Sequence, residues 1–206
     1  MFGDSIVAGS YRSSPRSTAP TKLGPGWAGM LGSLRPGGLQ VVDRSRGGQW
    51  LVSTNPIGPI PSVREFLLSE LATVPGARFA LVGAGRNDLY HVSDEQLRAA
   101  VDQLLAQARA SGVRIAFLTI NPVALTYESR SITEKQRVRF NTWLRTTHPD
   151  ATIDTDAVLD EDGNGALDNP LDSGDGFHLN AAGSTRVAQA AAAFILRQGW
   201  GASGAG

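Results

Sequence analysis

The stretch "ARFALVGAGRNDLYHVSDEQLRAAVDQLLAQARASGVRIAFLTI", residues 77–120, decides the fold class. It begins with the apolar run 77–83 and ends with a second apolar run, 113–120, and both are bounded by Gly, Pro or Asn. Runs of this kind are typical of strands buried on both faces of a parallel sheet. Between them, apolar residues recur at helical spacing over 93–112. A strand, a helix and a strand in this order predict two parallel strands joined by a right-handed crossover.

The same alternation continues on both sides of this unit. Ser93 with Gln96, and Thr133 with Gln136, have the spacing of capping boxes at helix starts. Alternating strands and helices predict a three-layer α/β/α sandwich with a central parallel sheet. The further expected elements are strands at 39–43 and, more weakly, 151–154, and helices at 62–74, 132–147 and 181–198.

One domain is expected to span residues 1–198, because this length suits a single hydrophobic core and no internal repeat is visible. Residues 9–26 are rich in Ser, Pro and Gly and predict a long loop, either mobile or a lid near a site. Residues 199–206, "GWGASGAG", predict a flexible C-terminal tail.

Composition narrows the function classes. The chain has 19 basic and 19 acidic residues, so nothing favours nucleic acid or an anionic membrane as partner. It has no cysteine, which excludes thiolate catalysis, disulfides and cysteine-ligated zinc. No apolar run approaches the ~20 residues that span a bilayer, and no secretion signal opens the chain. The compartment, secreted or cytoplasmic, and the oligomeric state are left open.

Four loops carry the side chains that suggest chemistry. In an open parallel sheet, ligands bind beyond the carboxyl ends of the strands, where these loops should meet. A serine hydroxyl needs a base to take its proton, and a histidine held by a carboxylate is the usual base. The loops read "GDSI" (3–6), "RGG" (46–48), "GRND" (85–88) and "DGFHLN" (175–180).

These four motifs, in this order, resemble the SGNH/GDSL hydrolase superfamily, and the match covers nearly the whole chain. The resemblance implies a flavodoxin-like fold. It implies that Ser5 is the nucleophile, that His178 is its base and that Asp175 orients the histidine. It further implies an oxyanion hole made by the backbone N–H of Ser5, the backbone N–H of Gly48 and the side chain of Asn87.

The first strand departs from the family pattern, and the second motif leaves a choice between two glycines. Only Met1 and Phe2 precede Gly3, so the first strand is expected to be truncated. Gly47 and Gly48 are adjacent, and counting from the strand at 39–43 favours Gly48. Beside the motifs, Asp4, Arg86 and Gln49 are expected to contact substrate.

The resemblance implies a serine esterase that cleaves short-chain acyl esters, in particular acetyl esters, with a carbohydrate as a candidate alcohol part. The expected partner is therefore a small-molecule or carbohydrate ester, and the reaction requires no metal or organic cofactor. Two alternatives stay open. One is an acyltransferase on the same scaffold, and the other is a non-catalytic glycan-binding module.

The segment "DEDGNGALDNPL" (160–171) allows one further interpretation. Asp160, Asp162, Asn164 and Gly165 match positions 1, 3, 5 and 6 of a calcium loop, but position 12 is Leu171 in place of glutamate. An acidic surface loop is the default interpretation, and calcium binding is the alternative.

Overall fold

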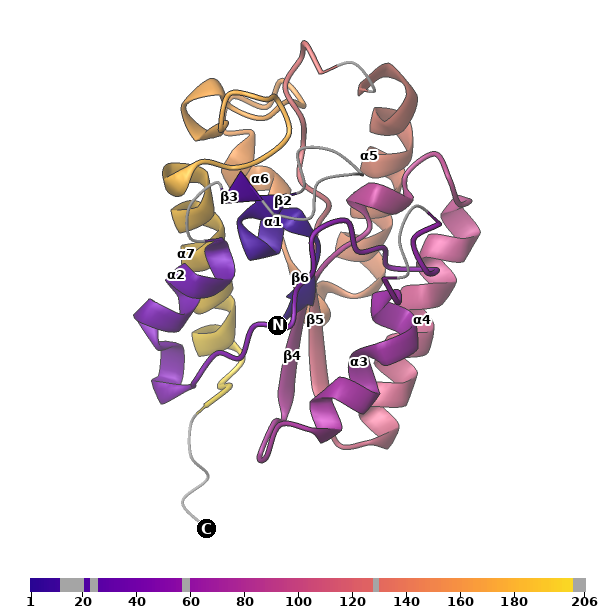
Figure 1. The fold of residues 1–206 in the computed structure, drawn as a ribbon, viewed down its shortest axis with the longest axis vertical. Helices are drawn as coiled ribbons and strands as arrows, with labels where there is room; N and C mark the ends of the chain where they lie inside the picture. Colours follow the sequence, from indigo (N-terminus) through magenta and orange to yellow (C-terminus); the bar gives the residue numbers. More distant parts are fainter. Residues whose placement is uncertain (12–20, 23–25, 57–59, 128–129, 202–206) are drawn as a thin grey trace.

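A parallel sheet runs through the middle of the molecule (Figure 1). The computed structural model describes residues 1–11, 21–22, 26–56, 60–127 and 130–201. Within these residues the sheet has four strands, in the order β1 (Phe2–Gly3), β4 (Phe79–Gly83), β5 (Arg114–Leu118) and β6 (Thr152–Ile153). All neighbouring strands pair in parallel, so the predicted α/β class and its central parallel sheet are confirmed.

Helices cover both faces of this sheet and make the three layers. Figure 1 shows α2 (Trp27–Leu34) and α7 (Ala181–Arg197) on one side of the sheet. On the other side lie α3 (Val63–Ala72) and α4 (Asp94–Ala110), with α5 (Arg130–Thr147) packed into the same core.

The strands alternate between two cores, which explains why they are apolar throughout. Along β5, Ile115 and Phe117 pack into the core formed with α3, α4 and α5, whereas Ala116 and Leu118 pack into the core formed with α2 and α7. Successive side chains of a strand point to opposite faces, so a strand between two helical layers is buried on both.

Short elements complete the connections. They are α1 (Ser5–Ala8), α6 (Asp156–Leu159), the antiparallel pair β2 (Ser10–Tyr11) and β3 (Thr21–Lys22), and the single turns η1 (Pro36–Gly38), η2 (Arg86–Asp88), η3 (Pro149–Ala151) and η4 (Asn169–Leu171). Most of the loop expected at 9–26, namely 12–20 and 23–25, lies outside the described residues. In the described part of the chain, no helix has the length and apolar character needed to cross a bilayer.

One of the two predicted capping boxes is confirmed. Ser93 caps α4, where its side chain accepts the N–H of Gln96 and the side chain of Gln96 returns to the backbone of Ser93. The box expected at Thr133 and Gln136 is wrong, because α5 begins at Arg130 and both residues lie inside it. Gln136 instead bonds the backbone of Tyr90 and Val92, which anchors the chain after η2.

The predicted strand at 39–43 is also wrong. This segment runs beside β1 without forming a strand. The amino group of Met1 donates to the carbonyl of Val42, but the backbone N–H bonds to the first strand come from the residues after the segment, Arg44 to the carbonyl of Met1 and Arg46 to that of Gly3. The segment itself therefore lacks the regular ladder of a parallel strand.

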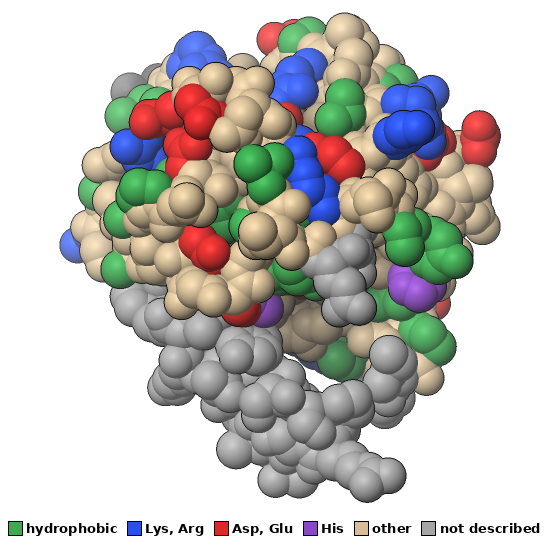
Figure 2. Space-filling model, turned by 90° about the horizontal axis from the view of Figure 1, so that it is seen from above, with side chains coloured by type: hydrophobic (Ala, Val, Ile, Leu, Met, Phe, Trp, Pro, Cys, Tyr) green, Lys and Arg blue, Asp and Glu red, His purple; other side chains and the backbone are tan. Residues whose placement is uncertain are grey.

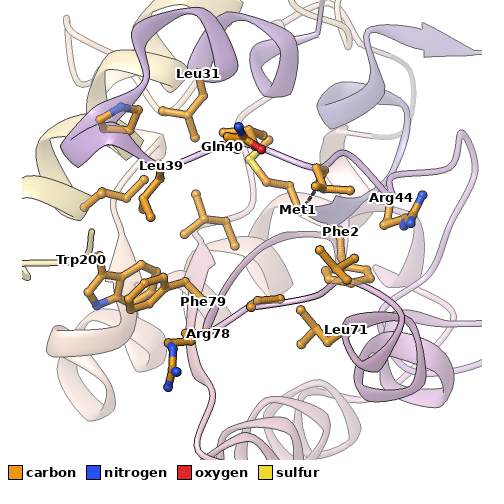
Figure 3. A pocket seen from close by; sticks show the side chains of 18 of the residues that line it. Met1, Phe2, Leu31, Leu39, Gln40, Arg44, Leu71, Arg78, Phe79 and Trp200 are labelled. Atoms are coloured by element: carbon orange, nitrogen blue, oxygen red, sulfur yellow. Dashed lines mark hydrogen bonds between the residues drawn. The ribbon is translucent and has the colours of Figure 1, made fainter. Parts of the chain in front are cut away.

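An apolar groove of about 260 Å³ opens at the amino end of β1 (Figure 3). Phe79 and Leu81 of β4 line it on one side, and Leu39 and Val41 line it on the other. Met1 lies at the same groove, so the short first strand leaves the space beside the start of β4 unfilled.

The start of the segment expected to be a flexible C-terminal tail, 199–206, is packed against the domain at Trp200. Trp200 is only 4% exposed, and its ring stacks on Phe79 with centroids 4.8 Å apart. Phe194 of α7 packs edge-on against the same indole. The large apolar ring therefore extends the packed chain past residue 199, and residues 202–206 lie outside the described range.

Candidate active site

The candidate site lies at the carboxyl end of the sheet, at the end of the molecule where Figure 1 shows α1. Figure 2 looks down on this end of the molecule, where basic and acidic side chains are interspersed over the described surface. Ser5 is the first residue of α1 and is separated from β1 by one residue, Asp4. Its side chain is buried, and Asp4 caps the short helix by accepting the N–H of Ile6 at 2.9 Å.

A hydrogen-bonded turn before α7 presents His178. The carboxylate of Asp172 accepts the N–H groups of Gly174 and Gly176, and Ser173 N–H donates to the carbonyl of His178 at 2.9 Å. Gly176 has φ +74°, a left-handed conformation that glycine adopts without strain. The turn ends at Asn180, whose side chain caps α7.

Asp175 holds the histidine at two points. Its Oδ2 lies 2.6 Å from Nδ1 of His178, and its Oδ1 accepts the backbone N–H of His178 at 2.8 Å. Partial burial acts to raise the pKa of Asp175, but hydrogen bonds from the backbone and ring of His178 and from the N–H of Phe177 outweigh it. The net pKa therefore lies below its ordinary value, and the carboxylate is ionised at neutral pH.

The structure brings Ser5 and His178 together across 173 residues of sequence. Oγ of Ser5 lies 2.9 Å from Nε2 of His178. Since Nδ1 faces Asp175, the two ring nitrogens contact a carboxylate and a hydroxyl on opposite sides. This chain of contacts can take a proton from the serine and stabilise the charge that results.

The loops that carry Gly48 and Asn87 are joined to each other. The Asn87 amide donates one N–H to the carbonyl of Gln49 at 3.0 Å. Gly48 has φ +76°, and its carbonyl accepts the Asn55 amide at 2.8 Å. An amide has two N–H groups, so Asn87 retains a second donor.

Asp88 fixes the arrangement of these loops, a role that the sequence did not reveal. Its fully buried carboxylate accepts the N–H of Leu51 at 2.7 Å and that of Val52 at 2.9 Å. Burial raises the pKa of Asp88 to about 6, against these two hydrogen bonds, which lower it. These partners lie 36 and 37 residues away in sequence, so no local pattern indicates them.

Two of the three residues expected to contact substrate lie in the interior. Asp4 is 2% exposed, and burial raises its pKa to about 7. Gln49 is fully buried, and its Nε2 donates to the carbonyl of Pro61 at 2.7 Å. Both side chains bond the protein's own backbone, and their contact with substrate stays a prediction. Arg86 differs, because it lines a pocket beside Asn87.

The acidic loop at 160–171 gathers three carboxylates, from Asp160, Asp162 and Asp168, with ligand atoms within 4.8 Å of one another. Leu171, at the position of the missing glutamate, is buried in the core. Calcium binding at this loop stays a prediction.

A Ser–His–Asp arrangement at the carboxyl end of a parallel sheet is typical of hydrolases that cleave acyl bonds. The chain belongs to the GDSL-like lipase/acylhydrolase family, whose profile matches residues 1–186. It is accordingly a carboxylic ester hydrolase. No curated protein sequence is significantly similar to the chain.

Solved structures share the fold at low sequence identity. A carbohydrate acetylesterase from Sinorhizobium meliloti superposes with a TM-score of 0.73 at 16% identity, covering 95% of this chain and 96% of that one. An inhibitor-bound aryl esterase from M. smegmatis superposes with a TM-score of 0.74 at 17% identity, covering 96% and 97% of the two chains.

Proposed function

We propose that this enzyme hydrolyses short-chain acyl esters, in particular acetyl esters, through an acyl-enzyme on Ser5. The observation that carries the proposal is the contact between Ser5 Oγ and His178 Nε2 at 2.9 Å, with Asp175 on the other ring nitrogen at 2.6 Å. A serine placed for structure alone has no need of a buried histidine aligned by a carboxylate.

The reaction follows from this geometry. Ser5 Oγ attacks the ester carbonyl carbon while His178 Nε2 takes the hydroxyl proton. The tetrahedral intermediate collapses, the carbon–oxygen bond to the alcohol breaks, and His178 returns the proton to the leaving alkoxide. Water then attacks the acyl-enzyme with the same histidine as base, which releases the carboxylic acid and restores Ser5.

The oxyanion is proposed to bind three donors. Ser5 begins α1, where backbone N–H groups have no acceptor within the helix. The N–H of Gly48 and the second amide N–H of Asn87 complete the set. In support, Arg46 N–H donates to the carbonyl of Gly3 at 2.8 Å and Asn87 bonds Gln49, so hydrogen bonds link all three loops. Each donor of this kind contributes about 10²- to 10³-fold to kcat.

The alcohol part is proposed to be a carbohydrate, with support from the fold shared with a carbohydrate acetylesterase. An acyltransferase with a sugar acceptor uses the same acyl-enzyme and differs only in the second step. A glycan-binding module without catalysis is less well supported, because binding alone needs no aligned Ser5–His178–Asp175 contacts.

The first experiment measures hydrolysis of p-nitrophenyl acetate, butyrate and octanoate by the wild type, Ser5→Ala and Ser33→Ala. Ser33 is an exposed serine of α2 and provides the matched control. We expect activity to fall with chain length, to be lost in Ser5→Ala and to persist in Ser33→Ala. Equal activity in all three proteins would refute Ser5 as nucleophile. Acylated sugar as the main product with an added sugar acceptor would identify a transferase.

A further inference from the structure

Arg86 is a buried cation that forms no direct ion pair with any described residue. The side chain is 6% exposed, and its Nη2 reaches the hydroxyl of Thr133 at 3.4 Å, at the long end of hydrogen-bonding distance. Its Nη1 is buried and has no hydrogen-bond partner. In the described part of the chain, no carboxylate forms an ion pair with Arg86.

The neighbouring Arg137 shows what this fold does with a structural buried arginine. Arg137 is 1% exposed, and its guanidinium bonds Glu134, Asp156 and the carbonyl of Ile120. Each nitrogen of that guanidinium thus has an acceptor, and the acceptors include the carboxylates of Glu134 and Asp156. The two arginines are similarly buried, but of the two only Arg137 forms ion pairs with described carboxylates.

The pocket beside Arg86 has the shape and lining of a ligand site. It has a volume of about 290 Å³ and is lined by Arg86, Asn87, Leu89, Tyr90, His91, Tyr127, Ile132, Thr133 and Phe177. Among the described residues that line it there is no Asp or Glu, and several carry aromatic rings. The ring of Phe177 lies 5.6 Å from the guanidinium carbon of Arg86 and 4.7 Å, between centroids, from the ring of His178.

Tyr90, in the wall of this pocket, has φ +74° and is 69% exposed. A bulky residue in the left-handed region is uncommon, and strain of this kind gathers at binding sites. Its backbone N–H is held by Gln136 at 2.8 Å, so the strained loop is fixed where it borders the pocket.

Arg86 keeps its charge in this setting. Burial, followed by repulsion from Arg137, lowers its pKa to about 10 against the opposing attraction of Glu134, Tyr127 and Asp4, which leaves it a cation at neutral pH. An unpaired buried charge is costly, and a guanidinium matches a carboxylate with two parallel hydrogen bonds. Planar rings in the wall suit a planar group attached to that carboxylate.

We propose that this pocket, the anion pocket, binds the carboxylate of an ester substrate whose charged group is attached to a planar or aromatic ring, with Arg86 as its counter-ion. The proposal rests on the proposed hydrolysis of acetyl esters at Ser5, and it names an aromatic or planar acid, in place of a carbohydrate, as the alcohol part of the ester. The pocket adjoins the active site through Asn87 and Phe177, so a substrate can place its carboxylate there and its ester carbonyl at Ser5.

A binding measurement tests the pocket without catalysis. Benzoate and its neutral isostere benzamide are titrated into the wild-type protein by calorimetry, and into Arg86→Met and Arg139→Met. Arg139 is an exposed arginine paired with Asp94 and provides the matched control. We expect benzoate to bind the wild type and Arg139→Met, about 10- to 100-fold more tightly than benzamide, and the preference to vanish in Arg86→Met. Equal affinity for benzoate and benzamide in the wild type would overturn the proposal, even if the variant fails to fold.

Kinetics then connect the pocket to the reaction. The ratio of kcat/KM for 4-acetoxybenzoate to that for phenyl acetate is expected to fall at least tenfold in Arg86→Met. It should fall less in Arg86→Lys, which keeps the positive charge but cannot donate two parallel hydrogen bonds to the carboxylate. An unchanged ratio in both variants would mean that Arg86 is structural, with a buried water in the adjoining cavity of about 20 Å³ as the partner of Nη1. A wild type that cleaves neither ester but binds benzoate would refute the proposed function and retain the anion pocket.

Discussion

Asp175 and His178 contact each other through both carboxylate oxygens, one on the imidazole at 2.6 Å and one on the backbone N–H at 2.8 Å. Because the two residues are three apart in one turn, the carboxylate fixes the position of the main chain and of the ring together. The side chain of Asp175 is 37% exposed, whereas that of His178 is 10% exposed. Solvent thus reaches the orienting group more easily than the proposed base.

Asp175→Asn is expected to lower kcat by ~10³- to 10⁴-fold with little change in fold. An asparagine can still accept the backbone N–H groups, but its NH₂ would face Nδ1 and favour the tautomer that cannot take the serine proton. The measurement is kcat for p-nitrophenyl acetate together with the thermal midpoint. Asp102→Asn, which removes the surface contact between Asp102 and His148 at 2.8 Å, is the matched control and should keep full activity. Comparable losses in both variants would contradict the assigned role.

Asp4→Asn is expected to stabilise the protein at alkaline pH. Burial raises the pKa of Asp4 from 3.8 to about 7, so between these values the folded protein holds a proton that the unfolded chain releases. The free energy of unfolding therefore falls as pH rises through this window and levels off above it. Asparagine caps a helix as well as aspartate and carries no charge.

The check is the thermal midpoint at pH 4 and pH 8. Asp4→Asn should match the wild type at pH 4 and exceed it by several degrees at pH 8. The exposed Asp150 gives the control, because Asp150→Asn should leave the midpoint within experimental error at both values. A variant that is less stable at pH 8 would show that the ionised carboxylate is needed.

Arg137→Met is expected to destabilise the fold by about 1–3 kcal/mol, since Glu134 and Asp156 lose their shared cation and keep only Arg130 and Arg145. Arg139→Met breaks the exposed pair with Asp94 and should cost about 0–1 kcal/mol. Urea unfolding of the two variants measures the difference. Similar costs would mean that the buried network contributes no more than a surface pair.

Much of the fold was predictable because its signals are local. The apolar run 77–83 and the helix after Ser93 depend on periodicity and capping within a few residues. The four motifs also predicted which distant residues would meet, and Ser5 does contact His178. The roles of these residues stay proposals until the variants are measured.

What the sequence could not show depends on partners elsewhere in the chain. The segment 39–43 has strand composition, but the backbone N–H bonds to the first strand come from Arg44 and Arg46, which follow it. Thr133 and Gln136 have capping-box spacing inside a helix that begins earlier. Trp200 follows a glycine in a polar tail, yet Phe79 and Phe194 supply the packing that buries it. That no described carboxylate pairs with Arg86 likewise follows from the three-dimensional arrangement and not from the sequence.

The groove at the amino end of β1 can accept an extension of that strand. Phe79, Ala80 and Leu81 pair with β5 on one side, whereas β1 pairs only with Val82 and Gly83 on the other. The amino group of Met1 donates to the carbonyl of Val42. Burial lowers the pKa of that amine to about 6, so the charged terminus is poorly accommodated there. An extended apolar segment joined to Met1 would continue β1 into the groove and replace the amine by an amide.

Adding Val-Ile-Val-Val before Met1 is therefore expected to raise the thermal midpoint by several degrees, because a central strand gains partners on both sides and buries apolar surface. Gly-Ser-Gly-Ser before Met1 is the matched control. It removes the buried amine equally but offers no side chains to the groove, so the difference between the two proteins isolates strand packing. Amide hydrogen exchange should show new protection along β4 in the apolar variant only. Equal midpoints and equal exchange would mean that the groove does not accept a strand.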